Sequence, residues 1–579
     1  MKMKERKSIR KPLSEIEYNE ISDINAIKRT INYNVKRYTF RANFLIMLLL
    51  IYEAFFWVFK FNFSAFGVNF TPFYFFIFSV VIFMLALFTF FDLYYIGLSN
   101  ILKLKIDPKS ILFLSSSTML CQLSLNLFLK QYTVSLPFVG LLILFAVLLE
   151  KKEAYIAKKV KQNFKFEVSQ KEKIAIKVKR AQTTPKKLFK ESSNEKDFKD
   201  IEKEKITANF NFFYNNLDFA FWEKIFSILA VFSVCVSFAL ATFSLILHKN
   251  MLYCLSCLSF LLIFSFPVLL PFSLYLKLYS FTKKAIKRGI MLFSYRCIKE
   301  TASIKSITLT SKDLYPNGNV ILREIKTFRG QRVDEAILYA AALTATTEGP
   351  LNNVFDKVIL GQKKMLHNVS DPTYSDEEGL LGWVDGKRIM IGNRDLLKSY
   401  GITPPSRDYE SKYRTDNKGI SYIAVGYDLI AMFVLEYIPN NNLVKSLKDA
   451  EKNNIKINIK TSDSNIDKDR ITRDFGLDIH SVGILPFKQA SFPHEEPDIE
   501  KKIIFEAINN KDKVLDGIIL SKQAYFSFKA IFGVQILAFL LALGIAFSLG
   551  VSGALDQLSE HEVFLFYLFW LIPSIFSIK

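Results

Sequence analysis

The chain has 579 residues, of which 50% are hydrophobic and 56 are phenylalanine, too many apolar side chains for the core of one soluble domain. Charged residues still make up 23% of the chain, so a water-exposed part must accompany the apolar part. The net charge of +21 gathers at the edges of the apolar segments. This placement favours contact with anionic lipid over nucleic acid binding.

The cysteines and the N-terminal stretch argue against a secreted protein. Four of the five cysteines, Cys121, Cys235, Cys254 and Cys257, lie in apolar stretches, so we expect no disulfide framework. The stretch MKMKERKSIRKPLSEIEYNE is basic and polar for too long before an apolar core begins. We therefore expect no cleavable signal peptide.

Eight segments approach the length of about 20 apolar residues that a bilayer-spanning helix needs. They run near 44–63, 72–93, 111–129, 134–149, 221–247, 252–276, 531–549 and 563–576, and the fourth and eighth are short. The connecting segments alternate between uncharged or acidic ones and ones rich in Lys and Arg. Because basic loops stay in the cytoplasm, this alternation predicts a multi-pass protein of the cell membrane with both termini cytoplasmic.

Two cytoplasmic insertions follow from this topology. The first, 151–220, is dominated by Lys, Glu and Asn, and we expect a solvated, partly helical or disordered linker there. The second, about 278–527, alternates strand-like runs such as YIAVGYDLIAMFVLEY with helix-like runs such as VDEAILYAAALTATT. This alternation predicts an α/β layer fold.

Four stretches, in this order of spans and insertions, give the chain a resemblance to the P-type ATPases, specifically their heavy-metal-transporting branch. GLLILFAVLLEKKEAYIAKKV resembles the end of the family's fourth span, and SFPVLLP with FTKKAIKRGIM resembles its metal-site span and the following basic helix. EGLLGWVDGKRIMIGNRDLL resembles the glycine-rich strands of the nucleotide-binding domain. DAEKNNIKINIKTSDSN with DFGLDIHSVGILPFK resembles the phosphorylation domain around the TGDN segment.

The resemblance implies a division of the chain into membrane and cytoplasmic parts. In chain order we expect a basic N-terminus at 1–42, four transmembrane helices at 43–150, a reduced Lys-rich insert in place of an actuator domain at 151–220, two helices with a proline-kinked span at 221–277, the start of a phosphorylation-like domain at 278–330, a nucleotide-binding-like domain at 331–430, the rest of the phosphorylation-like domain at 431–527, and two helices at 528–579.

The position of the family's nucleophile departs from the family pattern. The resemblance implies an aspartyl-phosphate on the Asp of a DKTGT motif, because a carboxylate attacks the γ-phosphorus and forms a labile acyl-phosphate. In LTSKDLYPNG, Thr310 stands at that position and Asp313 follows three residues later. A threonine hydroxyl would need an adjacent base, and its phosphate ester would be hard to remove. We therefore assign no catalytic residue.

Five further motifs of the family are missing or altered. GDGxND has no counterpart between Lys488 and Gly517, and 151–220 contains no TGE. The family's Ser-Glu-His-Pro, GxG and CPC motifs are altered, in that order, to Thr347-Glu348-Gly349-Pro350, Glu377-Glu378-Gly379 and Phe266-Pro267-Val268. Asp463 remains from the TGD segment, but one carboxylate cannot build a phosphoryl site, so we expect a structural role for it.

These losses predict a pseudoenzyme with a sensory, scaffolding or regulatory role. The alternative is an active ATP-driven heavy-metal or cation transporter with displaced catalytic residues, and a third reading is an ATP-independent channel or carrier. The resemblance implies ATP and Mg²⁺ as cofactors, whereas the missing carboxylates argue against a metal clamp for the transferred phosphoryl group. As partners we expect the lipid bilayer and another membrane or cytoplasmic protein, and no nucleic acid.

Gly379 and Gly382 are the nucleotide-binding candidates, because glycine lets the backbone approach a ligand. Glycines also make hairpin turns, and Asp385 and Gly386 between two strand-like runs indicate one. The nucleotide reading and the structural reading of Gly379 and Gly382 both stay open at this point.

Three further residues in the predicted spans are candidates for metal binding, and one is a candidate for an ion path. Cys254 and Cys257 share a helix face and suit a soft metal, or they are two small hydrophobes. Pro267 leaves a carbonyl without its helical partner, which either coordinates an ion or marks a kink needed for packing. Glu53, in the middle of the first span, belongs to an ion path or bonds a neighbouring helix.

Overall fold

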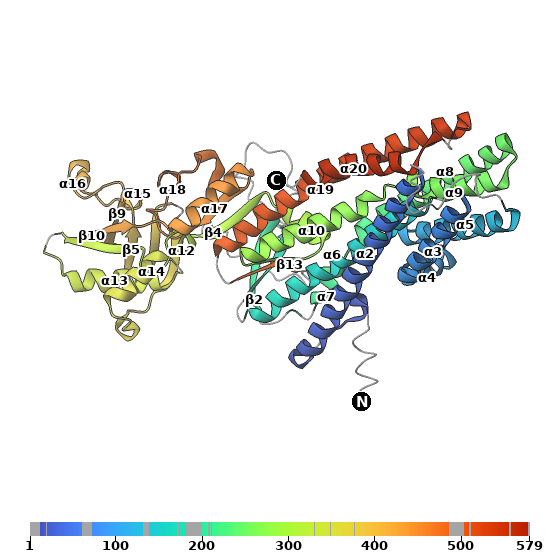
Figure 1. Cartoon of the computed structure of the whole chain (residues 1–579). Coiled ribbons are helices and arrows are strands. Elements are labelled where there is room, and N and C mark those ends of the chain that lie inside the picture. The colour runs from blue at the N-terminus through green and yellow to red at the C-terminus, as the bar shows by residue number, and fades with distance from the viewer. Residues whose placement is uncertain are drawn as a thin grey trace. The chain divides into compact units, whose positions relative to one another are not determined.

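The computed structural model in Figure 1 divides the chain into two compact units, residues 1–173, 206–299 and 520–579, and residues 174–205 and 300–519. The described residues are 12–18, 20–60, 72–130, 138–170, 173–180, 199–206, 209, 211–328, 330–347, 349–375, 377–485, 503–508, 511–554 and 557–576. Residues 1–11 of the predicted basic N-terminus and the stretch 486–502, where we searched for GDGxND, therefore lie outside the described part.

The first unit is helical, and two of its helices, α11 (Tyr295–Ala302) and α19 (Lys511–Ser552), continue into the residues of the second unit. Two 3₁₀ turns, η1 (Leu13–Glu15) and η2 (Ile21–Asp23), precede its helices. In chain order the helices are α2 (Ile24–Lys60), α3 (Pro72–Thr89), α4 (Phe91–Leu102), α5 (Pro108–Leu129), α6 (Val139–Ser169), α7 (Phe212–Leu217), α8 (Ala220–His248), α9 (Met251–Phe264), α10 (Leu269–Lys287), α11 (Tyr295–Ala302), α19 (Lys511–Ser552) and α20 (Glu560–Phe576). The short strand β3 (Ile290–Leu292) separates α10 from α11.

Six segments of the described helices are long and apolar enough to cross a membrane. They are Ile24–Phe59, Pro72–Thr89, Pro108–Leu129, Phe212–His248, Met251–Lys287 and Lys513–Ser552. They correspond to six of the eight predicted spans. The fourth predicted span falls on α6, whose apolar run ends at Glu150, and the eighth falls on α20, which has 17 residues. The chain is thus a polytopic helical membrane protein.

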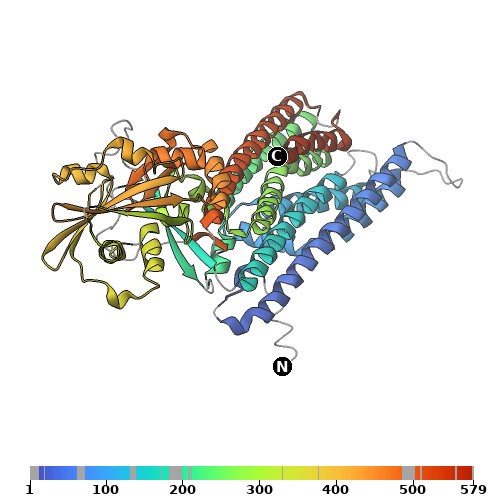
Figure 2. The same cartoon turned by 90° about the vertical axis from the view of Figure 1, so that its left-hand side faces the viewer.

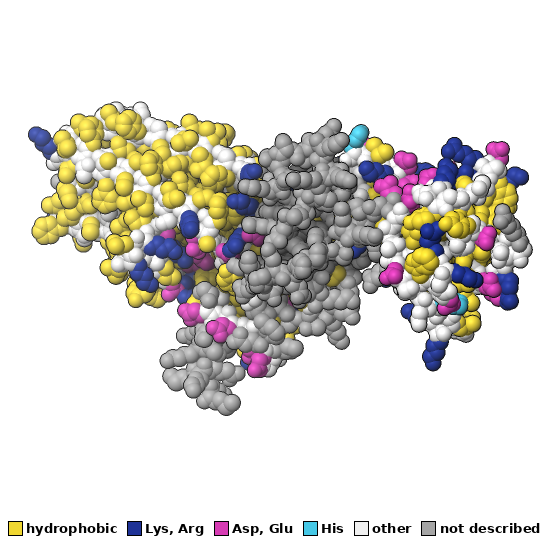
Figure 3. All heavy atoms as spheres, turned by 180° about the vertical axis from the view of Figure 1, so that it is seen from behind, with side chains coloured by type: hydrophobic (Ala, Val, Ile, Leu, Met, Phe, Trp, Pro, Cys, Tyr) yellow, Lys and Arg dark blue, Asp and Glu magenta, His cyan; other side chains and the backbone are white. Residues whose placement is uncertain are grey.

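The surface of these helices is apolar. Phe88 and Phe128 are 84% and 83% exposed, and Ile246 is 71% exposed. Figure 3 shows hydrophobic side chains covering the visible face of the membrane helices, with Lys and Arg confined to a few places. Because soluble proteins rarely expose an apolar surface of this extent, lipid is the environment that these helices require.

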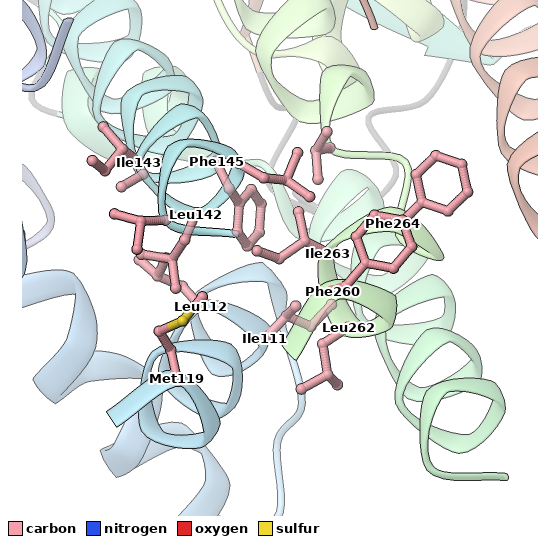
Figure 4. Close-up of a cluster of buried hydrophobic side chains, with 14 of the residues drawn as sticks. Ile111, Leu112, Met119, Leu142, Ile143, Phe145, Phe260, Leu262, Ile263 and Phe264 are labelled. Carbon is pink, nitrogen blue, oxygen red and sulfur yellow. The ribbon is translucent and has the colours of Figure 1, made fainter. Parts of the chain in front are cut away.

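The core of the membrane helices is built where α5, α6 and α9 meet. Figure 4 shows apolar side chains from these three helices converging, namely Ile111, Leu112, Met119, Leu142, Ile143, Phe145, Phe260, Leu262, Ile263 and Phe264. Along another side of α6, the long helix α2 runs beside it, as both cartoons show (Figures 1 and 2). The helix α6 is therefore central to the membrane unit.

The segment 151–220 contains more regular structure than the linker that we expected. The helix α6 continues to Ser169, and two strands, β1 (Lys173–Arg180) and β2 (Lys199–Ile206), follow it. They lie in a sheet with β13 (Ile503–Ile508) in the order β2-β1-β13. In the sequence KIAIKVKR an apolar residue stands at every second position from Ile174, and the side chains of 173–176 are all buried. Residues 181–198 lie outside the described part.

The second unit contains a six-stranded antiparallel sheet in the order β5-β10-β9-β8-β7-β6. Its strands are β5 (Val320–Thr327), β6 (Ser370–Ser375), β7 (Gly379–Val384), β8 (Lys387–Gly392), β9 (Lys418–Val425) and β10 (Asp428–Tyr437). Helices α13 (Val333–Ala345) and α14 (Pro350–Val358) cover one face, and α15 (Arg394–Ser399) and α16 (Arg407–Ser411) contribute to the core on the other. Along β8, Ile389 and Ile391 point to the first face and Met390 to the second.

A three-stranded parallel sheet in the order β12-β11-β4 completes this unit. Its strands are β4 (Ser306–Thr310), β11 (Lys456–Lys460) and β12 (Val482–Leu485), with helices α12 (Ser311–Leu314), α17 (Asn441–Lys452) and α18 (Lys468–Phe475) and a 3₁₀ turn at Ile479–Ser481. Another 3₁₀ turn, Lys363–Met365, lies between α14 and β6. The six-stranded sheet is inserted between α12 and α17. The expected α/β layer fold is thus confirmed.

Candidate functional site

The loops after β4 and β11 form the edge where the resemblance places phosphoryl chemistry. The two strands are parallel neighbours, and Thr310 pairs with Lys460 at their last residues. In open α/β sheets, ligands bind at the carboxyl ends of the strands. Thr310 and the loop beginning at Thr461 therefore lie together at the edge of the sheet where a nucleophile would act.

Thr310 and Asp313 are bonded to each other. Thr310 is the N-cap of α12, and its hydroxyl accepts a hydrogen bond from the backbone N–H of Asp313. In return, the Thr310 backbone N–H donates to Asp313 Oδ2 at 2.9 Å. This capping box satisfies two backbone donors at the helix start. The signal was present in the sequence as Thr-x-x-Asp, and we missed it by comparing this loop with the family motif alone.

Asp463 is 1% exposed and is held by donors from the fold. The Tyr437 hydroxyl donates to its Oδ2 at 2.6 Å, and the Asn465 backbone N–H donates to its Oδ1 at 3.0 Å. Burial raises the pKa of Asp463 above its usual value, because an anion loses its hydration there. Burial, and the neighbouring Asp463 carboxylate, also raise the pKa of Tyr437. The Asp463 carboxyl group thus has a structural partner on each oxygen.

The loop between β11 and α18 also binds the six-stranded domain directly. The Ser462 hydroxyl donates to Thr347 Oγ1 at 3.3 Å, next to the start of α14. The Asn465 side-chain amide donates to Ser421 Oγ, on β9, at 2.7 Å. Together with the bond from Tyr437 on β10, these contacts join the loop to three places of the other domain.

Arg470, at the start of α18, strengthens this junction. Its guanidinium donates to the carbonyl oxygens of Lys418 at 3.0 Å and Asn465 at 2.8 Å. The guanidinium carbon also lies 4.5 Å from the centroid of the Tyr437 ring, a cation–π geometry. We call this set of contacts from the 461–470 loop the interdomain junction. It joins the three-stranded sheet to the six-stranded sheet.

The two nucleotide-binding candidates are buried against the chain itself. Gly379 has a φ of +152°, and a β-carbon there would lie 2.2 Å from the Ile391 carbonyl oxygen. A β-carbon on Gly382 would lie 2.5 Å from Val369 Cγ1. Packing between neighbouring segments therefore accounts for both glycines, and their nucleotide role stays a prediction.

The structure also gives the hydrogen-bond partners of Glu378 and the conformation of the turn at Asp385 and Gly386. Glu378 accepts hydrogen bonds from Ser375 Oγ at 2.7 Å and from Ser399 Oγ at 3.1 Å. Asp385 and Gly386 have φ values of 47° and 75°, as a type I′ turn requires, which confirms the predicted hairpin. Glu348, in the altered Ser-Glu-His-Pro motif, lies outside the described residues.

The predicted metal candidates do not gather. Pro267 lies in the break between α9 and α10, whereas Cys254 and Cys257 are near the other end of α9. The Cys254 thiol donates to the Ala241 carbonyl at 3.4 Å, and Cys257 Sγ accepts from Ser244 at 3.7 Å. Within the described residues, no three His, Cys, Asp or Glu side chains are arranged to hold a metal ion. Each cysteine instead bonds α8.

Hydroxyl groups cap the backbone around the break that Pro267 marks. Ser265 Oγ donates to the Leu261 carbonyl at 2.6 Å, and the Tyr567 hydroxyl donates to the Ile263 carbonyl at 3.4 Å. Phe266 and Val268, which replace the family's two thiolates, are each 1% exposed. The Ile263 carbonyl, which Pro267 cannot bond because proline has no N–H, thus accepts a hydrogen bond from Tyr567 inside the protein.

Glu53, the ion-path candidate on α2, bonds a neighbouring helix. Its Oε2 lies 3.1 Å from Nδ1 of His561 on α20. The sequence could not pair these residues, because they stand in the first and last described membrane-unit helices. Whether the site also conducts an ion stays a prediction.

The comparisons with known proteins point to heavy-metal pumps. No family model matches the chain. The copper-exporting P-type ATPase of Staphylococcus aureus strain bovine RF122 / ET3-1 is 23% identical over 214 residues, which are 36% of this chain and 26% of that relative. Its counterpart in strain MRSA252 matches with the same identity and coverage. The matched stretch thus spans about a quarter of the length of these relatives.

Among solved structures, a zinc-transporting PIB-type ATPase in its E2.Pi state is 10% identical to this chain, with a TM-score of 0.45, over 94% of this chain and 100% of the other. The sequence match to the copper-exporting enzymes confirms the predicted resemblance. The chain is a membrane protein similar to the heavy-metal-transporting branch of the P-type ATPases.

Proposed function

We propose that the chain is a non-catalytic P-type ATPase-like membrane protein with a scaffolding, sensory or regulatory role. One observation carries this proposal. At the edge formed by β4 and β11, Thr310 occupies the nucleophile position, while the carboxyl groups of Asp313 and Asp463 both accept hydrogen bonds from the fold. Phosphoryl transfer of this type needs a carboxylate that is free to attack and oxygen ligands for Mg²⁺.

The interdomain junction supports the same proposal. A pump that binds ATP on one domain and transfers its phosphate to another has to bring these domains together and release them. Here the 461–470 loop holds both sheets through Tyr437, Ser421, Thr347 and Lys418. Such a junction favours a rigid cytoplasmic body, which suits a scaffold better than a cycling enzyme.

The alternative is an active ATP-driven transporter whose nucleophile is displaced to Asp313 or Asp463. It takes its support from the likeness to copper-exporting enzymes. In this case one of the two carboxyl groups would have to leave its present donors during the reaction.

The test is phosphorylation of the full-length protein, reconstituted in lipid, with γ-labelled ATP and Mg²⁺. We expect no acid-stable, hydroxylamine-sensitive label, because such a label reports an acyl-phosphate. The matched variants are Asp313→Asn and Asp463→Asn. A label on the unsubstituted protein that one variant abolishes would overturn the proposal and identify the displaced nucleophile. A heavy-metal-transporting ATPase labelled in parallel controls for the chemistry.

A further inference from the structure

A second group of buried acids lies in the membrane unit, where α2, α6 and α20 meet. Glu560 accepts a hydrogen bond from the Tyr52 hydroxyl at 3.4 Å and another from the Leu141 backbone N–H, in the first turn of α6. Next to it on α20, His561 Nδ1 lies 3.1 Å from Glu53 Oε2. Two carboxyl groups and an imidazole from opposite ends of the sequence thus meet at one place.

Gly140 makes this meeting possible. A β-carbon at Gly140 would lie 2.6 Å from Glu560 Oε1 and 3.1 Å from Glu53 Oε1. Both oxygens therefore point toward the bare backbone of the same residue. Glu53 Oε1 is buried and receives no hydrogen bond from the described residues. One of two neighbouring carboxyl oxygens thus lacks a donor.

A proton is the ligand that best fits these two neighbouring carboxyl groups. Two neighbouring carboxylates in a site of low dielectric repel each other, and one proton between them removes a charge and supplies the missing donor. The other titratable side chains on these helix segments are Tyr52 on α2 and Glu562, which is exposed, on α20. The described helix α3 and the apolar start of α6 bring no charged side chain. Among the described residues, no three His, Cys, Asp or Glu side chains are arranged to bind a metal ion in place of the proton.

We propose that Glu53, Glu560 and His561 form a proton-binding site that links the first and last helices of the membrane unit. One proton from water binds between the two carboxyl groups, and a second converts His561 to imidazolium beside Glu53. The set then changes from a charge of −2 to neutral, with no other bond formed or broken. The side chains of Glu53 and His561 are 21% and 18% exposed, so they lie near the surface of the helices.

The packing around His561 provides a reporter of its charge. The Trp57 ring stacks on the imidazole with centroids 4.9 Å apart and an interplanar angle of 21°, and the Phe56 ring meets it edge-on at 4.4 Å. An imidazolium ion under an indole ring makes a cation–π contact and quenches the indole fluorescence. The emission of Trp57 therefore reports the protonation of His561.

The test is a pH titration of tryptophan emission from the full-length protein in lipid nanodiscs, with Trp57→Phe subtracted to isolate Trp57. We expect quenching as the pH falls, and no such titration in His561→Gln. In Glu53→Gln the midpoint should move to lower pH by about one unit or more, because the neighbouring anion that favours imidazolium is lost. Glu562→Gln, on the same helix, is the matched control and should leave the midpoint in place.

Infrared difference spectra of the same samples, taken between high and low pH, test the shared proton separately. A protonated carboxyl band should appear on acidification and should change in both Glu53→Gln and Glu560→Gln. The proposal is overturned if Trp57 emission does not titrate, if Glu562→Gln shifts the midpoint as much as Glu53→Gln, or if the band changes in neither Gln variant. Should the Gln variants not fold, the unsubstituted protein decides, because absence of both the quenching and the band contradicts the site.

Discussion

The two groups of buried acids in this chain differ in one respect. At the edge of the parallel sheet, Asp463 has a donor from the fold on each carboxyl oxygen, and Asp313 closes a capping box with Thr310. In the membrane unit, one oxygen of Glu53 is buried without a donor from the described residues and faces a second carboxyl group. The Asp463 carboxyl group is therefore bonded by the fold on both oxygens, whereas the Glu53 carboxyl group has an oxygen that a ligand could use.

The largest effect should come from removing the best-bonded cytoplasmic acid. Asp463→Ala leaves the Tyr437 hydroxyl and the Asn465 N–H buried without an acceptor, which should lower the free energy of unfolding of the cytoplasmic unit by about 3 kcal/mol. Chemical unfolding of the full-length protein in detergent measures this loss. Asp469→Ala, an exposed position on α18, is the control and should change the value by less than about 0.5 kcal/mol. Equal losses of stability in Asp463→Ala and Asp469→Ala would show that the hydrogen bonds to Asp463 do not stabilise the fold.

Substitutions at Thr310 test whether this residue only caps α12 or takes part in a reaction. Thr310→Ala removes the hydroxyl that caps α12 and should cost about 1 kcal/mol of stability. Thr310→Ser keeps the capping oxygen and should retain most of the stability. Neither variant should alter labelling by γ-labelled ATP, so a label that depends on Thr310 would contradict its role as a cap.

A substitution at Gly140 tests the close approach of Glu53 and Glu560 in the membrane unit. Gly140→Ala places a methyl group within contact of both carboxyl groups and should drive them apart. We expect the Trp57 titration to keep its form, while its midpoint shifts by less than in Glu53→Gln, because the imidazole and Glu53 remain neighbours. An unchanged midpoint together with an unchanged infrared carboxyl band would show that the close approach over Gly140 does not govern the proton. Gly544→Ala, on α19 with open space around it, is the matched control.

The smallest effect concerns the pH dependence of stability. Burial raises the pKa of Asp463 in the folded chain, so the folded state holds this proton more strongly than the unfolded state does. The resulting stability is present below the ordinary Asp value of about 4 and is lost as the pH rises toward the folded-state pKa. Asp463→Asn cannot titrate, so its unfolding free energy should fall less between these values. Parallel pH slopes for the two proteins would contradict this assignment.

Local sequence patterns were sufficient to predict much of the fold. The strand-like run YIAVGYDLIAMFVLEY predicts β9 and β10, and Asp385 with Gly386 predicts the hairpin between β7 and β8. The apolar segments predict most membrane helices. The strand β1 was missed because its lysines were read as a solvated charge run, although every second residue is apolar.

The side-chain partners could not be predicted, because they are set by packing between distant parts of the chain. Tyr437 ends strand β10 of the six-stranded sheet and Asp463 follows strand β11 of the three-stranded sheet, and Glu53 meets His561 from the far end of the sequence. Pro267 predicts an irregular helix, but the hydroxyl of Tyr567 that caps the break comes from α20. Sequence analysis therefore singled out Glu53, Asp313 and Asp463 without revealing their partners, and it did not single out Glu560.

The helix α6 connects the membrane acids with the start of strand β1. Its first turn donates to Glu560, and in its last turn Glu167 accepts from the Asn209 backbone N–H at 2.9 Å and pairs with Lys173 Nζ at 2.5 Å. The 31 residues between Val139 and Ser169 form one unbroken rod, about 46 Å long at 1.5 Å per residue. Since a continuous helix resists compression, a displacement of the first turn of α6 along the helix axis would also displace its last turn, beside Lys173.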